Sequence, residues 1–335
     1  MAKHSREGQA GSHGGIGLVV ALVFVALAGM FAFLVFTGKI GKGPTYVVEV
    51  PAAGTQGDGN TEDTPAELEP KPFGQYTWAE LSEISSRIAA APTDEEGRAI
   101  AQEFGILDAD GRLVDAEHEL VLTDNTFAHV RVIGVRADSA ADGSGVRGLT
   151  LMAYLIAEEP MNETPSYEGG WEGSRMRSWL ADEGMALLPE DLSSLLVPVS
   201  KLTNNAGRTS ETADVTQTQD ALWLLSAHEV CGDVAWFTTE YGGNFGAASY
   251  DAVVNSEGTQ YEWFLEQGVT QEGGPAGLLA LTWRDASRPW WLRSPYPMDY
   301  TGQNADCFYQ VSTTGYPASV GVADSKAGVC IGFCL

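Results

Sequence analysis

The sequence has few basic residues, few cysteines and few histidines. Its 335 residues include 19 lysines and arginines against 45 aspartates and glutamates, which gives a formal net charge of −26 and a pI near 4.3. Because polyanions are bound by an excess of positive charge, this balance excludes nucleic acid and anionic lipid headgroups as partners. The first of the 4 cysteines is Cys231, so we expect no lipid anchor on a cysteine near the N-terminus.

Motifs of the common catalytic sites are also missing. The chain contains no Walker loop, no GxSxG, no HExxH, no dinucleotide fingerprint and no CxxC pair. His228 lies beside Glu229 and close to Cys231, which suggests a Cys/His pair, but no third orienting group accompanies it, and we interpret this block as packing. The sequence therefore predicts a protein that is not an enzyme and that has no metal and no cofactor.

One long apolar run is present near the N-terminus. It begins at Ile16, ends at Phe36 and contains no charged residue. As a helix rising about 1.5 Å per residue, it reaches about 32 Å, enough for the hydrocarbon core of a bilayer. A cleaved signal peptide would have a shorter apolar region and a small-residue cleavage site, whereas TGKIGKG follows here. We predict one transmembrane helix over residues 16–36.

Basic residues flank this run on both sides and do not decide its orientation. Lys3 and Arg6 precede it, and Lys39 and Lys42 follow it. Because long domains cross a membrane largely regardless of local charge, we expect residues 1–15 in the cytoplasm and the large C-terminal part outside the cell.

Two further segments precede the main body of the chain. Residues 37–75 are rich in proline, glycine and acidic residues, a composition that cannot bury a core and that predicts a stalk. Residues 76–118 form a helical lead-in, because Thr77 with Glu80 and Thr93 with Glu96 have capping-box spacing. The first helix is expected to run to about Ala90 and the second to stop at Gly105.

The remaining residues, 119–335, mix short strands with short helices and many turns. Ala128, Val130 and Val132 alternate with His129 and Arg131, the period of a half-buried strand. Short helices are expected over 172–180 and 191–196, and a buried strand over 221–225. This pattern predicts the α+β class.

Three sequence blocks are specific enough to indicate a family. GGWEGSRMRSWL at 169–180, LWLLSAHE at 222–229 and WWLRSP at 290–295 occur in that order, and the chain ends in GVCIGFCL. Together they resemble a bacterial surface-domain family of unknown function with the WWLRSP signature. The resemblance implies a fold of the C-type-lectin or formylglycine-generating-enzyme kind, so we expect a C-type-lectin-like domain after the transmembrane helix, the stalk and two short helices.

The resemblance also implies where a ligand would bind. Some members of the family are thought to be targets of diversity-generating retroelements, which randomise residues of the last strands and loops of a lectin-like scaffold. The segment from Tyr296 to Lys326 is polar, aromatic and turn-rich, with the Tyr and Ser content of adaptable binding loops. We predict the ligand-binding residues Tyr296, Asp299, Tyr300, Asn304, Tyr309, Tyr316, Ser319 and Asp324.

Randomisation of this segment stays an open alternative to ordinary loop composition. An asparagine codon randomised at its adenines reaches the residues Tyr316, Ala318, Ser319, Val320, Gly321, Ala323 and Asp324. It does not reach Met298, Gln303, Gln310 or Lys326.

The predicted function is that of a membrane-anchored bacterial cell-surface protein that binds an external protein or glycan. One alternative is an extracytoplasmic thiol-oxidising, copper-dependent enzyme of the formylglycine-generating kind, which would need Cys330 and Cys334 reduced and bound to metal. Another is a structural protein of the envelope. If a disulfide forms, Cys307 with Cys330 or Cys334 across neighbouring strands is favoured, because Cys330 and Cys334 on one strand would lie about 13 Å apart. The ligand and the oligomeric state stay open.

Overall fold

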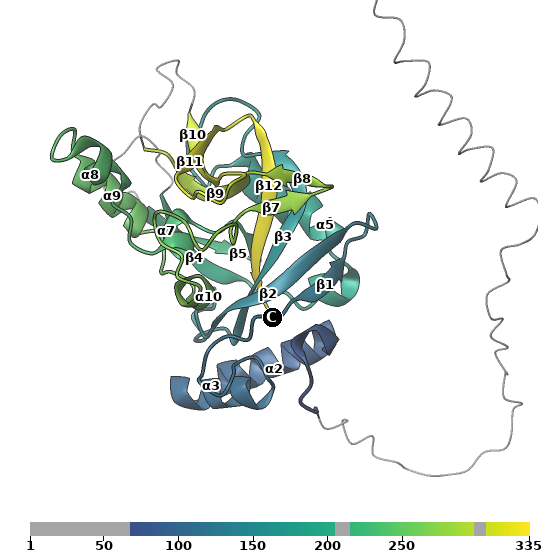
Figure 1. The fold of residues 1–335 in the computed structure, drawn as a ribbon. Helices are drawn as coiled ribbons and strands as arrows, with labels where there is room; N and C mark the ends of the chain where they lie inside the picture. The colour runs from purple at the N-terminus through teal and green to yellow at the C-terminus, as the bar shows by residue number, and fades with distance from the viewer. Residues whose placement is uncertain (1–67, 205–214, 298–305) are drawn as a thin grey trace, which may run out of the picture. The chain divides into compact units, whose positions relative to one another are not determined.

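Strands and short helices alternate along residues 68–204, 215–297 and 306–335, which are the residues that a computed structural model of the protein describes (Figure 1). They belong to a compact unit bounded by Ala66–Leu335. The predicted transmembrane helix and most of the predicted stalk lie outside the described residues. Within the described ranges, no helix is long and apolar enough to cross a bilayer.

Eight strands form the main sheet, in the order β1-β2-β3-β12-β9-β10-β11, with β6 also paired to β12. Their bounds are β1 His118–Val121, β2 Phe127–Val135, β3 Leu149–Pro160, β6 Leu222–Trp223, β9 Trp290–Pro295, β10 Cys307–Val311, β11 Ser319–Val322 and β12 Lys326–Cys334. The last strand of the chain, β12, therefore lies in the middle of the sheet. It runs antiparallel to β3 and parallel to β9, and it is buried except at Lys326.

Two hairpins lie outside the main sheet. Strands β4 Val199–Asn204 and β5 Val215–Asp220 form one, and β7 Leu281–Trp283 with β8 Ala286–Arg288 forms the other.

Helices are short and surround the sheet. Their bounds are η1 Phe73–Gln75, α2 Trp78–Ala90, α3 Asp94–Glu103, α4 Arg175–Trp179, η2 Leu180–Gly184, α5 Met185–Leu187, α6 Glu190–Ser193, α7 Ala227–Cys231, α8 Trp236–Tyr241, α9 Ala247–Asn255 and α10 Glu262–Glu266. The mixed α+β class is thus confirmed, with the sheet dominating the C-terminal part.

Helices α2 and α3 form as their caps predict. The Thr77 side chain accepts a hydrogen bond from the Glu80 backbone N–H, and the Glu80 carboxylate accepts one from the Thr77 N–H, so the first capping box is complete. Thr93 caps α3 in the same way, without the reciprocal bond. The last turn of α3 is followed by Gly105, whose φ of +67° lies in the left-handed region.

Ser85 joins helix α2 to the C-terminal strand. The buried Ser85 hydroxyl donates to the carbonyl oxygen of Leu335 and accepts from the Leu149 N–H at 3.0 Å. A Cβ added to Gly148 would come within 1.9 Å of the Ser85 carbonyl oxygen, so the helix and β3 approach as closely as glycine permits. Figure 1 shows α2 and α3 at the end of the sheet where the C-terminus lies. The two helices therefore share the core of the sheet domain.

The alternation predicted for Ala128, Val130 and Val132 is confirmed in β2. Ala128, Val130 and Val132 of β2 are buried, His129 is exposed and Arg131 is partly exposed. Asn125, at φ +63°, occupies the turn between β1 and β2.

Several local predictions differ from the structure. The helix expected over 172–180 begins only at Arg175, because the Ser174 side chain caps it there. The strand expected over 221–225 pairs as only two residues, β6. The C-terminal segment expected to form a polar, turn-rich face is partly buried. Every residue of β10 is buried, because β9 and β11 pair with it on both sides and α8 packs an aromatic side chain over it.

The cysteines are also arranged otherwise than expected. All 4 are described and buried, and no disulfide joins any of them. Strand β9 lies between β10, which carries Cys307, and β12, which carries Cys330 and Cys334, so the favoured pairing across neighbouring strands is not possible in this sheet order. Burial raises the pKa of the Cys330 thiol to about 12.

Candidate functional site

Helix α8 is held at one edge of the sheet domain by the next helix and by a loop. Both oxygens of Asp251, on α9, accept backbone N–H groups of α8: Oδ1 from Phe237 and Oδ2 from Thr238, each at 2.9 Å. The Trp236 indole N–H donates to the Gln271 carbonyl oxygen at 3.0 Å. These bonds fix the orientation of the aromatic side chains that α8 presents to the sheet.

The aromatic side chains of α8 meet those of β10 and of Tyr296, the residue after β9. The ring centroids of Trp236 and Tyr309 are 4.9 Å apart, and those of Phe237 and Tyr296 are 5.4 Å apart. Tyr296 and Tyr309 are themselves 5.4 Å apart, with an angle of 67° between their planes. The separations are those of favourable aromatic pairs, so the four rings form one continuous cluster.

A cavity of about 540 Å³ opens over this cluster. Volumes of this size are typical of sites for small ligands. Its lining combines five aromatic side chains, two carboxylates and small side chains of α8, β11 and the loop before β11: Trp236, Phe237, Thr239, Glu240, Glu272, Tyr296, Tyr309, Tyr316, Ala318, Ser319 and Val320. None of the described residues that line it is basic.

The cavity brings together half of the residues predicted to bind a ligand. Tyr296, Tyr309, Tyr316 and Ser319 line it. Asp324 is exposed in the turn between β11 and β12 and does not line it. The other predicted residues, Asp299, Tyr300 and Asn304, lie outside the described residues.

Five lining residues upstream of the C-terminal segment were missed by the sequence reasoning. They are Trp236, Phe237, Thr239, Glu240 and Glu272. The signal that could have found them is the adjacent aromatic pair at 236–237, which is followed four residues later by Tyr241. Only the packing of α8 against β10 shows that they face the same cavity.

The tyrosines of the cavity have unusual surroundings. The Tyr309 hydroxyl is buried and has no hydrogen-bond partner among the described residues, and burial raises the pKa of this residue well above its usual value. Tyr316 is 45% exposed, and its pKa is raised by partial burial and then by the charges of Glu272 and Glu240. A buried hydroxyl without a partner costs free energy.

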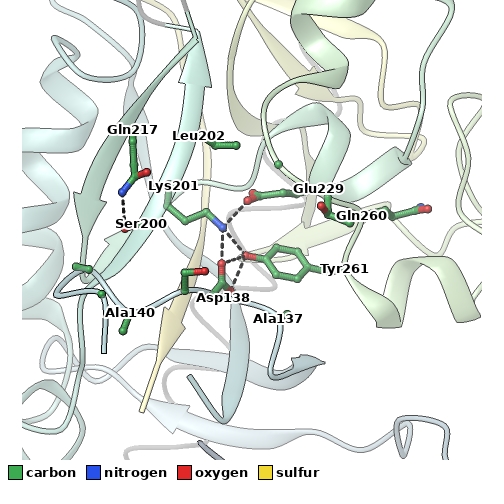
Figure 2. A pocket seen from close by; sticks show the side chains of 15 residues that line it. Ala137, Asp138, Ala140, Ser200, Lys201, Leu202, Gln217, Glu229, Gln260 and Tyr261 are labelled. Atoms are coloured by element: carbon green, nitrogen blue, oxygen red, sulfur yellow. Dashed lines mark hydrogen bonds and ion pairs between the residues drawn. The ribbon is translucent and has the colours of Figure 1, made fainter. Parts of the chain in front are cut away.

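A second cavity, of about 580 Å³, has a charged floor (Figure 2). Figure 2 shows the Lys201 ammonium among Asp138, Glu229 and Tyr261. Its nitrogen lies 2.7 Å from Asp138 Oδ1 and 2.8 Å from the Tyr261 hydroxyl, and it also pairs with Glu229. Burial by itself would lower the pKa of Lys201, but the charges of Asp138 and Glu229 outweigh it and hold the pKa above the usual value. All three ammonium hydrogens therefore have partners, and the lysine stays protonated.

The same network explains two of the family-like sequence blocks. Arg293, the arginine of WWLRSP, is fully buried and forms a two-pronged ion pair with Glu229, the glutamate of LWLLSAHE. Burial would raise the pKa of Glu229, but Arg293 and Lys201 outweigh it and lower the pKa to about 2. Arg293 also donates to the carbonyl oxygens of Leu224, Leu202 and Glu257, at 2.8, 2.9 and 3.0 Å. The two blocks are thus the halves of one buried contact.

The third block is held by a different carboxylate. Asp220, at the end of β5, accepts from the Trp171 indole N–H at 3.2 Å and from Arg177 Nε at 2.6 Å. Both donors belong to GGWEGSRMRSWL. The signature residues of all three blocks are therefore engaged in holding the fold together.

Glu257 is the one buried carboxyl of this network whose pKa is raised to about 7, chiefly by burial. Its Oε1 accepts from the Asn204 N–H at 2.7 Å, and its Oε2 has no hydrogen-bond partner among the described residues. The group is therefore half protonated near neutral pH.

The residues suspected of a nucleophilic role are arranged for packing. His228 Nδ1 faces Asn255 Oδ1 at 3.4 Å, and burial raises the pKa of the Cys231 thiol. In the described part of the chain, no group of three or more His, Cys, Asp and Glu side chains could hold a metal ion.

Comparison with known proteins shows the family. The model of a domain of unknown function, DUF6273, matches residues 147–335, more than half of the chain, and the protein belongs to this family. All three signature blocks lie within the matched residues. No curated protein and no solved structure gives a significant match to the chain.

Proposed function

We propose that the protein is a membrane-anchored bacterial cell-surface protein that binds an external protein or glycan in the aromatic cavity between α8, β10 and β11. The observation that carries the proposal is the set of five aromatic side chains that line a cavity of ligand size. The five aromatic side chains around it offer apolar area with two rotatable bonds each, so little conformational entropy is lost when they bind.

The membrane anchor and the exterior location belong to the same proposal. They rest on the apolar run at 16–36 and on the strongly acidic composition of the chain. A C-type-lectin-like scaffold is proposed for the DUF6273 domain on the resemblance of its signature blocks. Its sheet, with the last strand at the centre and binding loops at one edge, agrees with a rigid core that carries a variable face.

Diversification of the binding face is supported by the position of the candidate residues. Of the positions reachable from a randomised asparagine codon, Tyr316, Ala318, Ser319 and Val320 line the cavity. Gln310, which is not reachable in that way, is buried in β10. A reverse transcriptase gene and a near-copy of the last coding segment beside this gene would support this part of the proposal, and their absence would argue against it.

The binding test uses a panel of host proteins, glycans and cell-wall fragments with the wild-type protein and two bulky variants. Ala318→Trp fills the aromatic cavity and is expected to abolish binding. Leu202→Trp, in the lining of the second cavity, is the matched control and is expected to bind as the wild type does. Equal thermal unfolding of both variants would show that they fold. Binding that survives Ala318→Trp would show that the aromatic cavity is not the site.

The thiol-oxidising alternative requires reactive thiolates. Cys330 and Cys334 are buried, and burial raises the pKa of both thiols, which disfavours the thiolate that binds metal. Metal analysis of the purified protein separates the two functions, because bound copper with activity toward a peptide thiol would favour the enzyme. Self-association, or association with peptidoglycan instead of a soluble ligand, would favour the structural envelope protein.

A further inference from the structure

The aromatic cavity has a lining suited to positive charge. Faces of aromatic rings carry the negative part of a quadrupole and attract a cation within about 6 Å of the ring centroid, most strongly when the ring is tryptophan. Trp236, Phe237, Tyr296, Tyr309 and Tyr316 supply such rings here, and no lysine, arginine or histidine is among the lining residues.

The rings of the floor are set at angles to one another. Trp236 and Tyr309 are inclined by 38°, and Tyr296 and Tyr309 by 67°. Rings inclined in this way can contact one rounded group on more than one side. The hydrogen bond from the Trp236 indole N–H to the Gln271 carbonyl holds the tryptophan in place, so the arrangement needs no rearrangement to receive a ligand.

Two carboxylates stand at the rim of the same cavity. Glu240 follows the aromatic pair on α8, Glu272 lies in the loop after α10, and both are exposed. Both line the cavity together with Tyr316, whose pKa is raised by burial and then by the charges of Glu272 and Glu240. A neutral sugar or an anionic group gains nothing from this field, whereas a cation does.

We propose that the cavity recognises an organic ammonium group, quaternary or methylated, carried by the external ligand. This inference rests on the proposed function of the cavity and names the chemical group that it binds. Apolar rings favour such a weakly hydrated cation over a metal ion or a small inorganic cation, which would have to give up a tightly bound water shell.

The test compares two probes of equal shape on the full-length chain, purified in detergent because of its apolar N-terminal run. Choline carries a quaternary ammonium, and 3,3-dimethylbutan-1-ol has a neutral carbon in its place. Calorimetry is expected to show choline binding at least about tenfold more tightly than the neutral alcohol, and binding that weakens as salt is added. Equal affinity for the two probes, or no choline binding at millimolar concentration, would overturn the inference.

Matched variants locate the effect. Glu240→Gln and Glu272→Gln are each expected to weaken choline binding by about three- to tenfold, because each removes one rim charge, and to leave the neutral alcohol unchanged. Trp236→Leu is expected to remove choline binding. Glu183→Gln, an exposed carboxylate on η2 that does not line the cavity, is the charge-matched control and is expected to have no effect. An unchanged choline affinity in the Glu240→Gln/Glu272→Gln double variant would contradict the role given to the rim.

Further experiments identify the molecule that carries the ammonium group. They also separate the ammonium inference from the proposed binding function of the cavity. Phosphatidylcholine vesicles present it on a lipid, and a trimethyl-lysine peptide presents it on a protein; unmodified peptide and phosphatidylglycerol vesicles are the controls. If a ligand from the panel no longer binds the Ala318→Trp variant, but choline does not displace it from the wild type, the ammonium inference is overturned and the proposed function stands. If a ligand from the panel still binds the Ala318→Trp variant, the proposed function is overturned whatever the result with choline.

Discussion

Replacing Arg293 with methionine tests whether the WWLRSP and LWLLSAHE blocks are joined by a buried ion pair. The side chain is fully buried, and it donates two bonds to Glu229 and three to backbone carbonyls. Methionine keeps much of the volume but supplies no donor, so a carboxylate loses its main partner and three carbonyls lose a bond.

The cost follows from the contacts that are lost. Breaking a buried ion pair by removing one partner costs about 3–5 kcal/mol. Each buried carbonyl left without its bond adds about 1 kcal/mol or more, while the remaining pair of Glu229 with Lys201 returns part of the loss. We expect a decrease of about 4 kcal/mol in the free energy of unfolding, a large part of the stability of an ordinary domain.

Urea unfolding of the unit Ala66–Leu335, followed by tryptophan fluorescence, measures this loss. With a slope of about 3 kcal/mol per molar urea, the midpoint should fall by about 1.3 M while the slope stays unchanged. Arg87→Met is the control, because Arg87 is an exposed partner of Glu83 on α2 and its loss should cost about 0.5 kcal/mol or less. A shift below about 0.3 M for Arg293→Met would refute the assignment of the pair as a structural centre.

Three further predictions concern titration, attachment and thiol access. Glu257→Gln should flatten the dependence of the free energy of unfolding on pH. The pKa of Glu257 is raised from 4.5 to about 7, so the stability that this carboxyl contributes is fully present below pH 4.5 and is lost as the pH rises through 7. Urea titrations at different pH values should show a difference of about 3 kcal/mol. Ser85→Ala should lower the free energy of unfolding by about 1–3 kcal/mol, because it leaves the Leu335 carbonyl and the Leu149 N–H without a partner. All 4 cysteines should be unreactive toward a thiol reagent in the native protein and should react only after denaturation, because each is buried.

Each of these predictions has a result that contradicts it. Wild type and Glu257→Gln with parallel stability curves from pH 4.5 to 8 would show that the carboxyl titrates normally. Ser86→Ala, at an exposed position of the same helix, controls for serine loss, and an equal effect of both serine variants would remove Ser85 from the contact with the C-terminus. Rapid reaction of any cysteine in the native protein would mean that its strand opens to solvent.

The sequence by itself determined the local structure, because caps, turns and side-chain alternation act between residues a few positions apart. The box of Thr77 with Glu80 set the start of α2, and the alternation around Val130 identified the buried face of β2. The three signature blocks indicated a domain of unknown function, and all three lie in residues 147–335, which the DUF6273 model matches.

The candidate site could be predicted only in part, for a related reason. Tyr296, Tyr309, Tyr316 and Ser319 were expected on a C-terminal binding face, and they line the cavity. Trp236 and Glu240 could not be assigned to it, since no local pattern brings α8 to β10; the bonds from Asp251 and the ring contact with Tyr309 do so.

Tertiary structure alone decided which distant residues became partners. Glu229 and Arg293 are 64 positions apart, and in the sequence each was one charged residue inside an apolar block. Their pairing depends on the order of the strands, with β12 inserted between β3 and β9, and on the exclusion of water that makes an unpaired charge too costly to bury. The aromatic cavity has the same origin: chain composition supplied its rings, and the packing of α8 on the sheet placed them around a common space.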